Sequence, residues 1–169
     1  MLQTKKFCAI FAGMGNKLKK INDKVLVLGI GNILLGDEGV GVAVIRELEQ
    51  LSLPSHIDLL DGGTGGFHLL SYLQEYPEVI LIDATLDGHE PGTVSVLKPK
   101  FSNEFPRTLS SHDIGLKDLI ESAALLDDLP DITLITISVN PEQDLVMELS
   151  PAVAKAVQKV RKKVIEIVN

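Results

Sequence analysis

The chain has almost no cysteine: Cys8 is the only one among its 169 residues. A single cysteine excludes an internal disulfide framework and every zinc or iron-sulfur site that is built from clustered cysteines. Such usage is typical of a reducing compartment, so we expect a cytoplasmic location. We also expect one domain, because a chain of this length can bury a core without a disulfide or a structural metal.

Positive charge and long apolar runs are also scarce. The 16 basic residues are outnumbered by 23 acidic ones, which gives a net charge of -7, and only the predicted C-terminal helix has a basic face. Nucleic acid is therefore a poor partner for this chain. No apolar run reaches the roughly 18 residues that a membrane-spanning helix needs, so we expect no membrane insertion.

The first 23 residues do not share the regular pattern that follows them. An apolar run at 7–14 lies between lysines, as in a signal peptide, but it is short and no small-residue cleavage site follows it. We interpret residues 1–23 as an N-terminal arm, either poorly ordered or docked at an edge. Residues 24–169 are then a single α/β domain.

From Lys24 onward, predicted strands alternate with predicted helices. The strands are expected at 25–28, 57–60, 78–84, 93–97 and 132–139. The helices are expected at 40–51, from Phe67 onward, from Ser110 or Ser111 to about 126, and from an N-cap at Ser150 through Ile167. This alternation predicts a three-layer α/β/α sandwich around a five-stranded, mostly parallel sheet.

One strand of the sheet should run against the others. The connection between the strands at 78–84 and 93–97 contains a Pro-Gly turn and is too short for a helical crossover. The strand at 93–97 should therefore be antiparallel to the strand at 78–84, or at least not parallel beside it. The sheet is then mixed.

The stretch GIGNILLGDEGVG begins like a dinucleotide-binding loop and then departs from it. A Gly-x-Gly follows the first strand, and Asp61 stands where a ribose-binding acid would lie, but Leu34 occupies the third glycine position. Asp37 and Glu38 occupy the helix start that would receive phosphate. Two carboxylates there repel phosphate and favour a cation, so a degenerate nucleotide-binding domain is a disfavoured alternative.

Glu38 and Asp83 are the two acidic candidates for a functional site. An acid in the first helical turn interacts favourably with the helix dipole. This role is sufficient to explain one of the adjacent acids Asp37 and Glu38, and we assign it to Asp37 as the cap. Asp83 has an alternative role in turn initiation. If the first and third strands are neighbours, however, Glu38 and Asp83 face one crevice at the carboxyl ends of the strands, where ligands bind in open α/β sheets.

His112 is the best placed of the four histidines. It lies beside Ser110 and Ser111 at a predicted helix start, where the positive end of the helix keeps an imidazole neutral and able to bind metal. A lone histidine is more often a surface or core residue than a ligand, and the spacing by itself does not decide this.

Covalent catalysis finds little support in the sequence. Ser111, His112 and Asp113 are chain neighbours and cannot form a triad with one another, and neither a GxSxG nor an HExxH motif is present. A sparse set of Glu, Asp and His ligands suits a divalent ion such as nickel or zinc and leaves coordination positions open.

Four segments together resemble a known family: GIGNILLGDEGVG, DGGTGG, VILIDAT with the following PGTVSVL, and SSHDIGL. In order and spacing they are similar to the hydrogenase maturation endopeptidases, which process the large subunit of nickel-iron hydrogenases. The resemblance runs from about Lys24 to the C-terminal helix, and residues 1–23 depart from it. It implies an enzyme that removes a C-terminal extension from the large-subunit precursor after nickel insertion, with the nickel as recognition element.

By motif, the resemblance assigns Glu38, Asp83 and His112 as the metal-binding and catalytic set. It implies that nickel comes with the substrate and that other divalent ions, such as zinc or cadmium, can occupy the site. Whether the ion acts as template, Lewis acid or activator of water stays open. Asp37 and the DGGT segment would support the ligands or the bound peptide. The main alternative is a noncatalytic nickel-sensing or chaperone module that binds the precursor.

Overall fold

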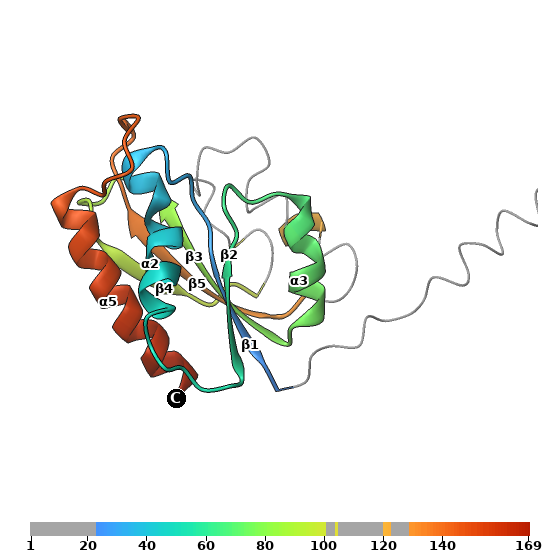
Figure 1. Cartoon of the computed structure of the whole chain (residues 1–169). Coiled ribbons are helices and arrows are strands. Elements are labelled where there is room, and N and C mark those ends of the chain that lie inside the picture. Colours follow the sequence, from blue (N-terminus) through green and yellow to red (C-terminus); the bar gives the residue numbers. More distant parts are fainter. Residues whose placement is uncertain (1–22, 101–103, 105–119, 123–128) are drawn as a thin grey trace, which may run out of the picture.

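The structure is a computed structural model, which describes residues 23–100, 104, 120–122 and 129–169 (Figure 1). The predicted arm therefore lies outside the described residues except for Asp23. In chain order the elements are β1 (Val25–Gly29), the 3-10 turn η1 (Gly36–Gly39), α2 (Val40–Leu48), β2 (Ile57–Asp61), the 3-10 turn η2 (Phe67–Leu69), α3 (Leu70–Glu75), β3 (Glu78–Thr85), β4 (Val94–Leu97), β5 (Asp131–Ser138) and α5 (Pro151–Val168).

The five strands form one mixed sheet in the order β2-β1-β3-β5-β4. The pairs β1–β2, β1–β3 and β3–β5 are parallel, and β4 is antiparallel to β5. The mixed sheet and the adjacency of the first and third strands are thus confirmed. β4 runs in the expected direction but lies beside β5, not beside β3. The reason is burial: β5 is buried along almost its whole length and takes the inner position, whereas the partly exposed β4 suits an edge.

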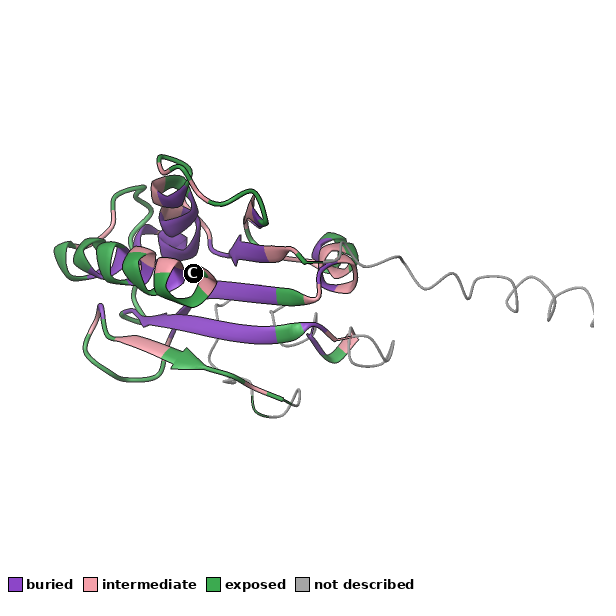
Figure 2. Cartoon of the chain, turned by 90° about the horizontal axis from the view of Figure 1, so that it is seen from below, coloured by how far each residue is buried: buried purple, intermediate pink, exposed green. Residues whose placement is uncertain are grey.

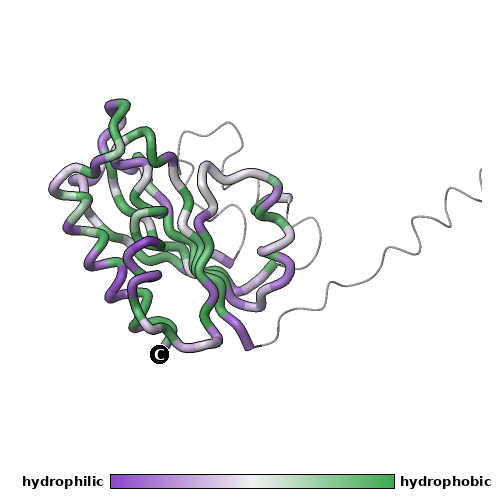
Figure 3. The backbone as a smooth tube through the Cα atoms, in the orientation of Figure 1, coloured by the Kyte–Doolittle hydropathy of each residue, from purple (hydrophilic) through white to green (hydrophobic). Residues whose placement is uncertain are grey.

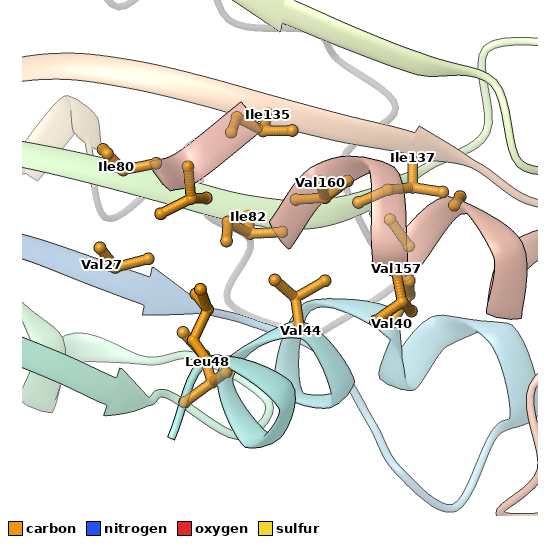
Figure 4. Packing of buried hydrophobic residues seen from close by; sticks show 14 of the residues in the cluster. Val27, Val40, Val44, Leu48, Ile80, Ile82, Ile135, Ile137, Val157 and Val160 are labelled. Atoms are coloured by element: carbon orange, nitrogen blue, oxygen red, sulfur yellow. The ribbon is translucent and has the colours of Figure 1, made fainter. Parts of the chain in front are cut away.

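Helices cover both faces of the sheet, as the three-layer prediction requires (Figure 1). On one face α2 and α5 pack against the strands, and Figure 4 shows Val44 of α2 and Val160 of α5 directed at Ile82 of β3. On the other face α3 and Ile120 close a second apolar cluster. The inner strands β1, β3 and β5 are buried over most of their length (Figure 2). Burying apolar side chains on both faces is the main source of stability for such a sheet.

The start of α5 follows the predicted pattern. Ser150 is the N-cap, its hydroxyl accepts the backbone N–H of Val153 at 3.5 Å, and Pro151 is the first helical residue. No helix in the described part of the chain is long and apolar enough to cross a membrane.

Two apolar residues at the ends of predicted helices, Phe67 and Ile167, are exposed. Ile167 is 38% exposed, because the side chains that α5 directs at the core recur with the 3.6-residue period of a helix. At the end of α5 this position is occupied by Val168. Phe67 is 54% exposed, because it opens the 3-10 turn η2 and the buried side begins with Leu69 and continues to Leu73. Of the helix predicted from Ser110 or Ser111 to about 126, only residues 120–122 are described, and they are helical.

A polar cluster joins three elements at the amino-terminal side of the sheet. Lys24 donates from Nζ to both carboxylate oxygens of Asp58 at 2.9 Å, and the Tyr76 hydroxyl donates to Asp58 Oδ2 at 2.7 Å. The hydrogen bonds from Tyr76 and Lys24 lower the pKa of Asp58 against the opposing effect of burial. Burial and the Asp58 carboxylate raise the pKa of Tyr76. The cluster therefore ties the entry to β1, strand β2 and the end of α3 together.

Replacing Asp58 by Asn should lower the free energy of unfolding at pH 7 by about 1 kcal/mol, since the cluster is partly exposed to solvent. Because the pKa of Asp58 is lower in the folded state, its contribution is complete above the unfolded pKa of about 4 and is lost as the pH falls through the folded value. Urea unfolding at pH 7 and at steps below pH 4 measures this, and the difference between the proteins should shrink toward acid. Tyr76→Phe keeps the Lys24 pair and should lose only part of the effect. A constant difference at every pH would contradict this account.

Candidate functional site

On the face covered by α3, strands β3 and β5 change from apolar to polar toward their carboxyl ends. Because side chains alternate along a strand, Leu81 is followed on this face by Asp83, and Leu134 by Thr136. The buried polar residues of the two strand ends on this face are Asp83, Thr85, Thr136 and Ser138. Buried polar groups require hydrogen-bonding partners or a ligand. This edge of the sheet is therefore the candidate site.

Asp83 lies inside β3 and is fully buried, at 0% exposure. Its Oδ1 accepts the backbone N–H of Ala84 at 2.8 Å. The strand continues to Thr85, one residue past the predicted range 78–84, so a role for Asp83 in turn initiation does not apply. A carboxylate placed in the central strands of a sheet is costly to bury, which favours a functional over a purely structural role.

Glycines bring the start of α2 into backbone contact with the ends of β1 and β3. A Cβ on Gly41 would lie 2.4 Å from the carbonyl oxygen of Ile82, and a Cβ on Gly29 would lie 2.2 Å from the carbonyl oxygen of Gly41. Glu38 precedes Gly41 by three residues and Asp83 follows Ile82 directly. The contact therefore places Glu38, which is only 3% exposed, at the same edge of the sheet as Asp83.

The turn before Glu38 depends on a further glycine. Gly31 has a φ of +152°, and a Cβ there would lie 2.0 Å from the carbonyl oxygen of Glu38. Glycine is needed at this position both for its backbone conformation and for the close approach of the two segments. The glycine-rich loop that resembled a nucleotide-binding turn thus serves to pack Glu38 against the sheet.

Asp37 does not cap the helix that it begins. The turn η1 has no side-chain cap, and Asp37 Oδ1 instead accepts the backbone N–H of Ser150 at 2.6 Å. The assignment of Asp37 as the cap of its own helix is therefore wrong. The sequence could not show this contact, because the two residues are 113 positions apart. Asp37 is 4% exposed, and its carboxylate links the Glu38 turn to the start of α5.

Sequence reasoning also missed the loop between β5 and α5 as a support for the Glu38 turn. The backbone N–H of Asp37 donates to Gln143 Oε1 at 2.9 Å, and the N–H of Gly36 donates to the carbonyl of Val146 at 2.7 Å. Gln143 is itself held by a hydrogen bond from its Nε2 to the carbonyl of Asn140 at 2.7 Å. None of these residues belongs to a pattern that could be recognised locally.

The DGGT loop pairs with the loop after β1. Asp61 Oδ1 accepts the N–H of Gly63 at 2.9 Å, and Gly31 N–H donates to the carbonyl of Gly63 at 2.7 Å. Gly62 N–H donates to the carbonyl of Gly29 at 2.9 Å. Asp61 is exposed and closes a local turn.

The connection after β3 is fastened to the end of β5 by Asp87. Its Oδ2 accepts a hydrogen bond from the Ser138 hydroxyl at 3.1 Å and lies 3.0 Å from Nδ1 of His89. Burial acts to raise the pKa of Asp87, but the hydrogen bonds from His89 and Ser138 outweigh it and the pKa is lowered. His89 is exposed and belongs to a turn, so it is not a ligand candidate.

His112 lies outside the described residues, so two of the three predicted ligands are placed. In the part of the chain that the structure describes, no group of three or more His, Cys, Asp or Glu side chains could hold a metal ion. The two buried carboxylates at the sheet edge supply oxygen ligands only. A metal site that uses them needs a further ligand, and the assignment of His112 to that role stays a prediction.

The fold and the buried acids define a doubly wound α/β protein with a carboxylate site at the carboxyl edge of its sheet. The family model for hydrogenase maturation protease (HycI) matches residues 42–167. This match begins after Glu38 and includes the positions of Asp83 and His112. The chain therefore belongs to the hydrogenase maturation protease family.

Individual relatives agree with this family. The hydrogenase expression/formation protein HupD of Rhodobacter capsulatus is 39% identical over 138 residues, which cover 78% of this chain and 65% of that protein. The hydrogenase 2 maturation protease of Escherichia coli is 36% identical over 110 residues, covering 63% of this chain and 67% of that protein. The chain spans 65% and 58% of the HupD proteins of R. capsulatus and Bradyrhizobium diazoefficiens, less than two thirds of either.

The solved structures include close matches to this fold. The hydrogenase maturating endopeptidase HybD of E. coli superposes with a TM-score of 0.76 at 31% identity, covering 86% of this chain and 91% of that one. HybD of Thermococcus kodakarensis superposes with a TM-score of 0.71 at 29% identity, covering 86% and 99% of the two chains. The α/β architecture predicted from the sequence is thus that of solved maturation endopeptidases.

Replacing Gly41 by Ala tests the glycine contact that places Glu38. The added Cβ would meet two backbone oxygens, at 2.2 Å from Ile30 and 2.4 Å from Ile82, and neither can move as a flexible side chain can. The free energy of unfolding should fall by about 3 kcal/mol or more, as measured by urea unfolding.

Gly63→Ala is the matched control for this substitution. Gly63 has a φ of +53° but nothing lies within 4 Å of its added Cβ. Its cost should be only the backbone strain of about 1 kcal/mol. If both variants lost the same stability, the close backbone contact at Gly41 would not be the constraint that we describe.

Proposed function

We propose that this chain is an endopeptidase that removes a C-terminal extension from the nickel-loaded large-subunit precursor of a nickel-iron hydrogenase. Membership of the hydrogenase maturation protease family supports the reaction class. The observation that carries the choice of site is the placement of two buried carboxylates, Glu38 and Asp83, at one edge of the sheet. Family membership thus supports the reaction class, and the burial of the two carboxylates supports the location.

We further propose that Glu38, Asp83 and His112 complete the coordination of the nickel ion that the substrate carries. Carboxylate oxygen and imidazole nitrogen are suitable ligands for a divalent transition ion. The backbone contact at Gly41 and the Ala84 N–H bond to Asp83 fix the two carboxylates before the substrate arrives. A fixed ligand pair loses little entropy on binding, which favours recognition of the metal-loaded precursor over the metal-free one.

In this proposal nickel is a template that places the scissile peptide beside the sheet edge. Hydrolysis breaks the peptide C–N bond, and water supplies the hydroxyl to the new carboxyl group and a proton to the released amine. The protein's contribution is to orient the peptide relative to the ion and to supply carboxylate ligands to that ion. The DGGT loop, which pairs with the loop after β1, is suited to contact the extended peptide at this edge.

Replacing Glu38 by Gln or Asp83 by Asn should stop precursor processing. Each change removes one charged ligand and keeps the shape of the side chain, so processing should fall by about 100-fold or more, since even outer-shell partners of metal ligands contribute 10–100-fold. The measurement is the mass of a purified precursor, with and without bound nickel, before and after incubation with each protein. The wild type should shorten only the nickel-loaded form.

Glu78→Gln is the matched control, because Glu78 is an exposed acid at the opposite end of the same strand as Asp83. It should process the precursor like the wild type, and all three variants should keep the thermal midpoint of the wild type. Processing by Glu38→Gln at the wild-type rate would remove Glu38 from the site. Binding of the precursor by the wild type without any change in its mass would favour the noncatalytic module.

A further inference from the structure

The connection between β5 and α5, residues 139–150, carries three consecutive exposed apolar residues. Leu145 is 84% exposed, Val146 is 42% exposed and Met147 is 60% exposed. Figure 3 shows this loop projecting from the carboxyl edge of the sheet, with hydrophobic residues at its outer end. Contiguous exposed apolar side chains are costly in water and mark surfaces that bind another molecule.

The same loop borders a groove of about 430 Å³ between α2 and α5. It is lined by apolar side chains of the loop, of the segment before η1 and of both helices: Ile33, Ala43, Met147, Leu149 and Val157. Gly36 and Gly39, the two ends of η1, also line it, so the groove reaches the turn that carries Glu38. We call the groove together with residues 145–147 the docking surface.

Three hydrogen bonds connect the loop at 139–150, which carries part of the docking surface, to the Glu38 turn. Gly36 donates to the carbonyl of Val146, the N–H of Asp37 donates to Gln143, and Asp37 Oδ1 accepts from the N–H of Ser150. The docking surface is therefore continuous with the proposed nickel site through backbone and buried side-chain contacts. A molecule bound there contacts the segment that positions Glu38.

Arg46 and Glu47 line the groove itself, whereas the charges around residues 145–147 are all negative. Glu142, Asp144 and Glu148 flank the apolar residues and are exposed. Within the described ranges, none of the three forms an ion pair with Lys or Arg. Their charges are available to a partner that carries basic residues. A second copy docked symmetrically through this surface would instead set these acids against their own counterparts.

We propose that the docking surface binds a segment of the precursor polypeptide that inserts an apolar side chain into the groove and sets Lys or Arg residues against the three carboxylates. The proposal rests on the proposed function. The docked segment is distinct from the scissile peptide, because the groove lies on the α2 and α5 face whereas Asp83 lies on the face covered by α3. Binding at the docking surface thus contributes to substrate specificity independently of the nickel ion.

The double substitution Leu145→Ser and Met147→Ser tests the apolar part of the surface. Both side chains are exposed, so the fold should be retained. Steady-state cleavage of the nickel-loaded precursor should show a KM raised by about tenfold, the effect of one well-packed contact residue, with an unchanged kcat. The double substitution Asp144→Lys and Glu148→Lys should also raise KM and should reduce its dependence on salt.

Leu97→Ser and Ile167→Ser are the matched controls, because these residues are 37% and 38% exposed and lie on β4 and at the end of α5. Both should keep the KM of the wild type. An unchanged KM in the Leu145 and Met147 double variant would overturn the proposal. Sedimentation gives a second test. If the wild type is a dimer and the double variant is a monomer, the proposal is overturned, because the surface then binds a second copy of the chain.

Direct binding separates this proposal from the proposed function. Calorimetric titration with the nickel-loaded precursor should show that Glu38→Gln, which does not cleave it, still binds through the docking surface. Adding the Leu145 and Met147 double substitution to Glu38→Gln should weaken this binding about tenfold. A wild type that binds the precursor and leaves its mass unchanged overturns the endopeptidase proposal only. If the wild type cleaves the precursor but the Leu145 and Met147 double substitution does not weaken binding of the precursor, only the docking proposal is overturned. Absence of binding by the wild type overturns both proposals.

Discussion

The backbone contact between the start of α2 and the ends of β1 and β3 is the constraint on which the site depends. Gly29 and Gly41 allow helix and sheet to approach so closely that a Cβ at either position would overlap a backbone atom. This approach determines where the η1 turn lies, and with it Glu38. A larger separation would leave an apolar helix packed on the sheet but would take the Glu38 turn away from Asp83.

The three buried acids at this edge have separate roles because their surroundings differ. Asp37 accepts the N–H of Ser150 and joins the η1 turn to α5, which is a structural role. Asp83 stands in a central strand, where the apolar face of the sheet becomes polar. Glu38 lies in the η1 turn, which the glycine contact positions at the edge of the sheet. The loop at 139–150 supports this turn through Gln143 and Val146 and carries the exposed Leu145 of the proposed docking surface.

The sequence predicted the fold well because local residue patterns determine most of its strands and helices. The apolar runs of β1, β3 and β5 and the Ser-Pro start of α5 identified strands, helix and layers, and the carboxyl-edge rule predicted that Glu38 and Asp83 share one edge of the sheet. Contacts between distant segments could not be predicted. The Asp37 bond to Ser150, the pairing of β4 with β5 and the support from Gln143 depend on tertiary packing that no local pattern encodes. His112 was singled out by its motif and lies outside the described residues.

The central claim is that Glu38 and Asp83 bind nickel carried by the substrate. X-ray absorption at the nickel edge tests it most directly, on a freeze-quenched mixture of nickel-loaded precursor and this protein. The account predicts that the wild type adds oxygen or nitrogen ligands to the nickel of the precursor and that the Glu38→Gln and Asp83→Asn double variant adds fewer. A nickel spectrum that the wild type leaves identical to that of the precursor alone would contradict it.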